Sequence, residues 1–352
     1  MRARLSALRG EGVAPRALDA RALAALAANP GCRRRALLDG AGVDKAKLAQ
    51  ALGSPASFGQ SQFAFARGNS FEAKVKADGG AELLGLLCRR LGVEAPAADE
   101  VTVPDLSAPG PAGRTARTAL ELRAAVERGA WTLFDHPMLS LEVAGSPVYL
   151  EPDAVVVDPD GTVTVIEIKS FPILDGSADP SKVGAAARQS AVYVLALAAH
   201  TVRERVLLVC PKDFSNTPAA DLLDVRPQLS VTRRQLARLT RLEAIAAGLP
   251  GDVSFDVERP AAELTRSVEA VPAAYSPECL AACELAFHCR GRSRAAGEVL
   301  ALGRSVRGEL GALRTVDAVL DAASGLDGAG DPAADALRRA ARLRAEALGV
   351  AG

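Results

Sequence analysis

The sequence carries no net charge and has no long apolar run. Its 352 residues include 42 Lys and Arg against 42 Asp and Glu, so no global field attracts it to nucleic acid or to an anionic membrane. The longest uncharged stretch, residues 48–66, is interrupted by Gln, Ser and Pro, whereas a membrane-spanning helix needs about 20 mostly apolar residues. Arg2, Arg4 and Arg9 interrupt the N-terminus before the apolar segment of a signal peptide can form. We therefore expect a cytoplasmic protein with no membrane partner.

Cysteine is also scarce, and six are too few for a disulfide framework in a chain of this length. Three of them, Cys279, Cys283 and Cys289, are nevertheless close together in the sequence, which in a reducing compartment indicates a metal or redox site. Three thiols are one ligand short of zinc or an iron–sulfur cluster, and the missing ligand is either His288 or a distant cysteine. Cys88 and Cys210 lie in apolar segments and are expected in the core.

The order of the predicted elements indicates an α/β fold, in which a mixed central sheet is flanked by helices and extended by helical segments at both ends. Gly79 and Gly80 are expected to bend the first core helix, and a turn is expected at residues 158–161. The predicted helices cover 17–28, 35–38, 45–52, 71–91, 118–128 and 181–199. The predicted strands cover 147–157, 162–170 and 205–210. A strand and a long helix are expected within 224–249, and a helical tail over 292–348.

The most informative segment is the predicted hairpin, because folding it back about its turn places Asp153 opposite position 166 or 167. Directly opposed side chains on antiparallel strands have β-carbons about 4.5 to 5.5 Å apart. Two carboxylates this close in an apolar sheet repel each other unless a cation lies between them. Strand alternation also places Glu167 and Lys169 on one face. The segment therefore predicts a magnesium site with a lysine beside it; a solvated sheet edge with a surface salt bridge is the alternative.

Four motifs in this order resemble the RecB-like branch of the PD-(D/E)XK nucleases. They are Gly68-Asn-Ser-Phe-Glu72, Asp153, Glu167-Ile168-Lys169 and Gln189-Ser-Ala-Val-Tyr193. The resemblance implies a PD-(D/E)XK core in which Glu72, Asp153, Glu167 and the carbonyl of Ile168 hold Mg²⁺ or Mn²⁺ and Lys169 is the catalytic lysine. Glu72 stands where the commoner form of the first motif has His, and a glutamate is an equally suitable ligand for a hard cation.

The same resemblance extends to Gln189 and Tyr193, which it implies contact the substrate strand. Some RecB-like nucleases, among them AddB-type repair subunits and the iron–sulfur nucleases of CRISPR adaptation, have one cysteine far upstream of the core and three just after it. By that resemblance Cys32, Cys279, Cys283 and Cys289 hold a [4Fe-4S] cluster that staples the fold. Here three residues, not the usual two, separate the first clustered pair, which keeps zinc open.

Arginines beside the cysteines fit a path for phosphates. They are Arg33, Arg34 and Arg35 after Cys32, and Arg290, Arg292 and Arg294 after Cys289. The chain is thus expected to be a metal-dependent deoxyribonuclease, an exonuclease on single-stranded or frayed DNA. Its expected segments are a helical one over 1–59, the nuclease core over 60–290 and a helical tail over 291–352. The sequence contains no helicase motif, so any unwinding would come from a partner protein.

Two alternatives stay open from the residues themselves. The first is a non-catalytic DNA-binding or assembly subunit that keeps the nuclease fold. The second is a zinc-stabilised regulatory protein. The oligomeric state does not follow from the sequence.

Overall fold

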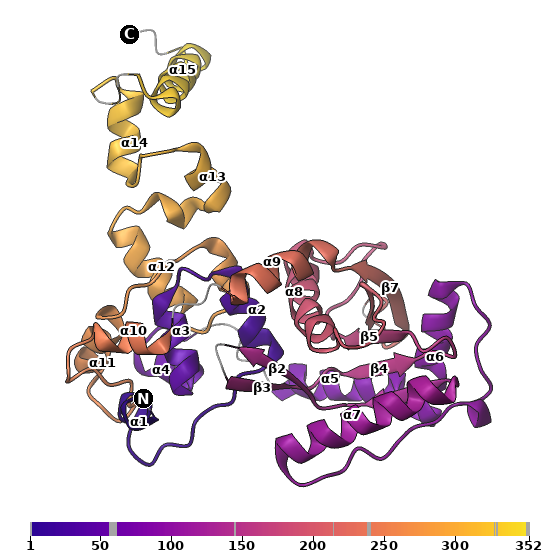
Figure 1. The fold of residues 1–352 in the computed structure, drawn as a ribbon. Coiled ribbons are helices and arrows are strands. Elements are labelled where there is room, and N and C mark those ends of the chain that lie inside the picture. The colour runs from indigo at the N-terminus through magenta and orange to yellow at the C-terminus, as the bar shows by residue number, and fades with distance from the viewer. Residues whose placement is uncertain are drawn as a thin grey trace. The chain divides into compact units, whose positions relative to one another are not determined.

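The computed structural model describes residues 2–55, 62–143, 146–213, 215–237, 241–326, 328 and 330–349 (Figure 1). The chain forms two compact units. The first comprises Met1–Pro30, Arg35–Val43 and Ser57–Pro250, and the second comprises Gly31–Arg34, Asp44–Ala56 and Gly251–Gly352. The expected boundary after residue 59 lies outside the described residues, and the expected division into three functional segments stays a prediction.

A five-stranded mixed sheet forms the centre of the first unit. Its order is β1-β4-β5-β6-β7, and β5 and β6 are its parallel pair while the other neighbours are antiparallel. The strands are β1 (Thr132–Asp135), β4 (Ala154–Val157), β5 (Val163–Ile168), β6 (Arg205–Pro211) and β7 (Pro218–Asp224). A separate antiparallel pair consists of β2 (Leu139–Val143) and β3 (Ser146–Leu150). The predicted α/β class with a mixed sheet and flanking helices is confirmed.

The turn between β4 and β5 has the predicted composition and place. The amide of Gly161 donates to the Asp158 carbonyl at 2.9 Å, and the Asp158 carboxylate accepts from the amides of Asp160 and Thr162. Gly161 has φ +75°, and a β-carbon there would lie 3.1 Å from Val126 Cγ1. Glycine is therefore the residue that this turn requires, and the turn fixes the register of the two strands that it joins.

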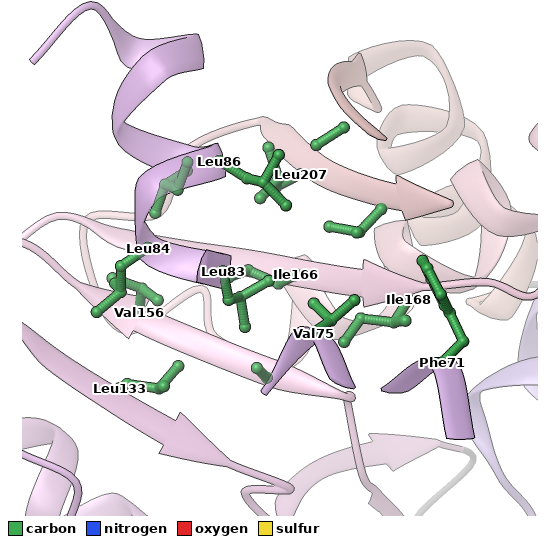
Figure 2. Packing of buried hydrophobic residues seen from close by; sticks show 14 residues of the cluster. Phe71, Val75, Leu83, Leu84, Leu86, Leu133, Val156, Ile166, Ile168 and Leu207 are labelled. Atoms are coloured by element: carbon green, nitrogen blue, oxygen red, sulfur yellow. The ribbon is translucent and has the colours of Figure 1, made fainter. Parts of the chain in front are cut away.

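One face of the sheet packs against α5 (Gln62–Val75) and α6 (Ala77–Leu91). Figure 2 shows Phe71 and Val75 from α5 and Leu83 from α6 among the sheet residues Ile166 and Ile168. Both isoleucines are buried, and they lie on the face that strand alternation predicted. Burying a large apolar side chain contributes roughly 1.5 to 3 kcal/mol, so this cluster anchors β5.

A kink lies near the start of α6, where a single helix over 71–91 was expected to bend. Asp78, Gly79 and Gly80 all have left-handed backbone angles. Gly80 has φ +81°, and a β-carbon on it would collide with the Leu133 side chain. The bend is confirmed, but the first helix begins at Gln62 and not at residue 71.

The opposite face of the sheet is covered by α8 (Pro180–Ala196), whose Ala186 packs against Leu208 and Cys210. Asp179 caps this helix by accepting from the Ser181 and Lys182 amides. The remaining helices of the first unit are α1 (Arg2–Arg9), α2 (Ala20–Ala28), the 3₁₀ turn η1 (Ala98–Glu100), α7 (Gly110–Arg128), α9 (Arg226–Leu236) and α10 (Leu242–Ala247); α3 (Arg33–Ala41) is divided between the two units.

The described part of the second unit is built from helices and short turns. These are α4 (Lys45–Ala51), α11 (Ala261–Glu269), η2 (Pro277–Ala281), α12 (Ala286–Ala295), η3 (Val299–Leu302), α13 (Arg304–Glu309), α14 (Val316–Ala323) and α15 (Pro332–Ala347). The predicted helical tail is confirmed over its described residues. Within the described ranges, no helix is both long enough and apolar enough to cross a membrane.

Three elements predicted after residue 140 differ from the structure. The single strand over 147–157 is two strands in different sheets, β3 and β4, because the chain breaks at Glu151-Pro152-Asp153. Pro152 lacks the amide that a continuous ladder needs. The strand expected after residue 224 is not found among the described residues, since β7 ends at Asp224. The long helix expected there is two helices, α9 and α10. The break before β4 matters for the site, because it leaves Asp153 just outside the strand.

Candidate functional site

The strand register brings Asp153 and Glu167 together. Ala154 pairs with Ile166 in the antiparallel ladder, so the next step along it sets position 153 against 167, one of the two predicted pairings. The amide of Ile168 donates to Asp153 Oδ2 at 2.6 Å. This bond fixes the Asp153 carboxylate beside the end of β5. The predicted hairpin geometry is therefore present.

Glu167 is fully buried within the sheet, and neither of its carboxylate oxygens accepts a well-directed hydrogen bond from a described residue. Burial raises its pKa to about 7, with the Asp153 charge adding to the shift. Burial also raises the pKa of Asp153. A buried carboxylate that lacks donors calls for a cation, and carboxylate oxygens suit Mg²⁺ or Mn²⁺. The residues present therefore fit the divalent ion that the motif implies.

Lys169 places a positive charge beside the Asp153–Glu167 pair. Its ammonium forms an ion pair with Glu167 Oε1, and its amide donates to the Val209 carbonyl at 2.8 Å, which extends the pairing of β5 with β6. Burial alone would lower the pKa of Lys169, but the Glu167 and Asp153 carboxylates raise it, and the net shift is upward. Lys169 is thus held charged beside the two carboxylates.

Glu72 lies on α5, and its side chain contacts Lys76 and His136 and not the Asp153–Glu167 pair. Its Oε1 lies 2.5 Å from Lys76 Nζ and 3.0 Å from His136 Nε2. The hydrogen bond from His136, assisted by Lys76, lowers the pKa of Glu72 to about 2 in spite of its partial burial. No described residue forms a hydrogen bond with Oε2. Among the described residues, no group of three or more Asp, Glu, His or Cys side chains is arranged to hold a metal ion in the structure as it stands. The structure brings together the predicted pair but not the predicted triad.

Sequence reasoning missed Lys76 and His136. Lys76 Nζ is surrounded by Glu72 Oε1, Asp135 Oδ1 at 2.7 Å, the Asp153 carbonyl at 2.7 Å and His136 Nε2 at 3.0 Å. His136 has φ +43°, which is uncommon for a residue with a β-carbon. Its amide donates to the Asp153 carbonyl, and its carbonyl accepts from Arg114. No sequence signal marks these residues, because three separate elements bring them together.

Gln189 and Tyr193 lie one turn apart on α8, and they are bonded to each other. Gln189 Nε2 donates to the Tyr193 hydroxyl at 3.1 Å, and that hydroxyl donates to the Glu151 carbonyl at 3.1 Å. Tyr193 is buried, which raises its pKa well above the usual range. In this structure the pair supports the segment that leads into Asp153; contact with a substrate strand stays a prediction.

The second unit contains all four predicted cysteine ligands. Cys279 lies in η2, Cys289 lies in α12, Cys283 lies between these elements, and Cys32 belongs to the segment Gly31–Arg34. All four lie outside any disulfide and have intermediate exposure. Cys32 and Cys279 are near enough to Cys289 to affect its pKa, which burial raises. The thiols are soft donors that fit zinc or an iron–sulfur cluster.

Two further residues bear on the cysteine segment. Arg34 Nη1 donates to Cys289 Sγ at 3.2 Å, its Nε donates to the Val271 carbonyl at 3.1 Å, and its amide donates to the Pro272 carbonyl at 2.9 Å. These bonds hold the Cys32 segment against residues 271–272 and 289. His288 is buried, and its Nε2 has no hydrogen-bond partner among the described residues, so it stays an alternative fourth ligand.

The expected phosphate path is only partly available. Arg33 is exposed and Arg290 is half-buried. Arg34 is buried against Cys289, and Arg35 is buried with its guanidinium bonded to Asp39 at 3.0 Å. The prediction that these two arginines bind phosphate is wrong, because both side chains are buried and their guanidinium groups bond Cys289 and Asp39. For Arg33 and Arg290 it stays a prediction.

Comparison with known proteins adds little. No family model matches the chain, and no curated protein matches it. A solved structure titled "Crystal structure of SSO0001" aligns with 30% of this chain and 48% of its own, with 17% identity and a TM-score of 0.20. The chain thus spans about half the length of that structure. A likeness at this TM-score supports no statement about fold or function.

Proposed function

We propose that this protein is a metal-dependent nuclease with a PD-(D/E)XK core, acting on single-stranded or frayed DNA. The observation that carries the proposal is the fully buried Glu167, opposite Asp153, with the Lys169 ammonium beside it. A solvated sheet edge would leave these groups exposed. Burying them without a ligand costs free energy, and such an arrangement is typical of a functional site.

The residues have distinct roles in this proposal. Asp153, Glu167 and the Ile168 carbonyl would hold Mg²⁺ or Mn²⁺, with Glu72 as a further ligand. The bound ion would supply Lewis-acid activation of the phosphate and of the attacking water. Lys169 stabilises the negative charge that develops on the phosphoryl group, and burial strengthens that interaction. Asp153 is kept in place by the Ile168 amide, and Tyr193 supports the preceding Glu151.

The cysteine segment is proposed to hold a [4Fe-4S] cluster on Cys32, Cys279, Cys283 and Cys289. Its contribution is structural, because it would join the Cys32 segment to η2 and α12 within the second unit. The bonds from Arg34 to Cys289, Val271 and Pro272 support this assignment, since they hold the Cys32 segment beside α12 and residues 271–272. The buried, unpartnered His288 Nε2 favours the alternative of zinc with a histidine ligand.

A cleavage assay tests the enzyme. Labelled single-stranded and duplex DNA is incubated with Mg²⁺ or Mn²⁺ and either the intact protein, Lys169→Ala or Lys182→Ala. Lys182 is an exposed lysine on α8 and loses the same charge on substitution. Removing Lys169 should slow cleavage by about 10² to 10³ or more while the fold is kept, and Lys182→Ala should cleave normally.

Equal rates for Lys169→Ala and the intact protein would remove Lys169 from the mechanism. DNA binding by the intact protein with no cleavage under any of these conditions would support the non-catalytic alternative.

A further inference from the structure

The ammonium of Lys76 lies among three acceptor oxygens and the His136 imidazole. Glu72 Oε1 is at 2.5 Å, Asp135 Oδ1 and the Asp153 carbonyl are each at 2.7 Å, and His136 Nε2, which donates to Glu72, is at 3.0 Å. Two carboxylates and one carbonyl suit an ammonium or a divalent ion, and the imidazole becomes a metal ligand when its Nε2 carries no proton. Lys76 places a single positive charge, carried on a flexible side chain, at this position.

Two residues connect this donor set to the Asp153–Glu167 pair. Asp153 gives its carbonyl to Lys76, while its carboxylate lies beside Ile168 and Glu167. Glu72 uses Oε1 for both Lys76 and His136, and no described residue bonds its Oε2. Each residue therefore has one oxygen on Lys76 and at least one oxygen left for a second cation. Shared oxygen ligands of this kind are typical of sites that hold two metal ions about 3.5 to 4 Å apart.

We propose that Lys76 is a built-in cation that takes the place of a second divalent ion, so that the intact protein binds one exchangeable ion at its carboxylates. The inference rests on the proposed function for the identity of the first ion. The charge balance supports it: Glu72 and Asp135 carry two negative charges, and Lys76 neutralises one of them. With the His136 imidazole neutral and Lys76 removed, the four donors would carry a net charge of −2, which a divalent ion balances.

The second ion would be held by Glu72, Asp135, His136 and the Asp153 carbonyl. The backbone keeps these donors in place independently of Lys76. The His136 amide donates to the Asp153 carbonyl at 3.3 Å, and the His136 carbonyl accepts from Arg114 at 2.9 Å. The site should therefore persist when the lysine is replaced by a smaller side chain.

The test counts manganese ions. Full-length protein freed of divalent ions is titrated with Mn²⁺, and bound Mn²⁺ is measured by electron paramagnetic resonance. We expect one ion per chain for the intact protein and two for Lys76→Ala. Lys74→Ala is the matched control, because Lys74 is exposed in the last turn of α5, two residues before Lys76, and it should bind one ion. The double variant Lys76→Ala/Asp135→Asn should lose the additional ion.

An equal count for Lys76→Ala and the intact protein would overturn the proposal, and so would a lower count. Lys76→Met, which keeps most of the stem, carries the same expectation. If both variants unfold without metal, Mn²⁺ should restore their circular dichroism, and failure to do so also contradicts the proposal. An intact protein that binds no ion would instead refute the first ion of the proposed function, and a single ion gained by Lys76→Ala would still support the role of Lys76.

Discussion

The carboxylate pair and the cysteine segment are both predicted from spacing in the sequence, but the structure holds them by different means. Asp153 and Glu167 are set by hydrogen-bonded pairing of adjoining strands and by the Ile168 amide. The cysteines lie on short turns and a helix end, and Arg34 joins the Cys32 segment to Cys289 and to the carbonyls of Val271 and Pro272. The first site is therefore a product of strand pairing, and the second depends on the bonds that the side chain and amide of one residue, Arg34, make outside any sheet.

The two sites should therefore differ in how much their folding depends on a bound metal. Strand pairing and the cluster around Ile166 and Ile168 maintain the carboxylate pair without a ligand. A site made of thiols on short elements gains its order from the metal, because binding free energy becomes folding free energy. We expect the second unit to depend on its metal and the first unit to fold without one.

The largest expected effect is the loss of the cysteine centre. Cys289→Ser should lower metal affinity by more than about tenfold and should lower the unfolding temperature of the second unit. Iron and zinc analysis of anaerobically purified protein measures the metal, and a broad visible absorbance identifies iron–sulfur. Cys88→Ala is the control, since it removes a thiol from the buried core of the first unit.

Cys88→Ala should keep its metal content and lose only packing stability. If the two cysteine variants retain the same amount of metal, the four-cysteine centre is wrong.

The next effect is a pH dependence of the carboxylate site. The pKa of Glu167 is raised from 4.5 to about 7, so the native state keeps a proton that the unfolded chain loses between these pH values. The free energy of unfolding of the metal-free protein should therefore fall as the pH rises from 4.5 to 7, by on the order of 3 kcal/mol from this group. Denaturant unfolding in the presence of a chelator measures the slope.

Glu167→Gln should flatten that slope, because the amide does not titrate. The raised pKa of Asp153 acts in the same direction and leaves a residual slope. The lowered pKa of Glu72 stabilises the protein above pH 4.5, and this contribution is lost toward pH 2, outside the interval. A slope unchanged by Glu167→Gln would show that this carboxylate is not protonated in the native state.

The smallest effect concerns the support of Asp153. Tyr193→Phe removes the hydroxyl that donates to the Glu151 carbonyl and accepts from Gln189. Loss of this buried hydrogen bond should cost about 1 kcal/mol in the free energy of unfolding. Tyr149→Phe is the control, because no hydrogen bond of the Tyr149 hydroxyl is found among the described residues. Unchanged stability with a raised KM for DNA would instead favour direct contact of Tyr193 with the substrate.

The sequence predicted those features that depend on local patterns. Asp158 and Gly161 indicate the turn, alternation separates Glu167 from Ile166, and the paired glycines indicate the kink. The short strands β1 and β2 were not predicted, because four or five residues of mixed polarity carry little periodic signal. The Lys76 cluster was also missed, since it assembles residues from α5, the end of β1 and the break before β4. Contacts of this kind arise only when the sheet has formed.

The most direct test of the central claim is calorimetric titration of Mn²⁺ into the metal-free protein and into Asp153→Asn. The asparagine keeps an oxygen for the Ile168 amide and loses the negative charge, so the fold should be retained. Asp160→Asn, in the exposed part of the turn, is the control. We predict that Asp153→Asn binds Mn²⁺ at least about tenfold more weakly than the intact protein and Asp160→Asn. Equal affinity in all three proteins would contradict the claim that Asp153 and Glu167 hold a divalent ion.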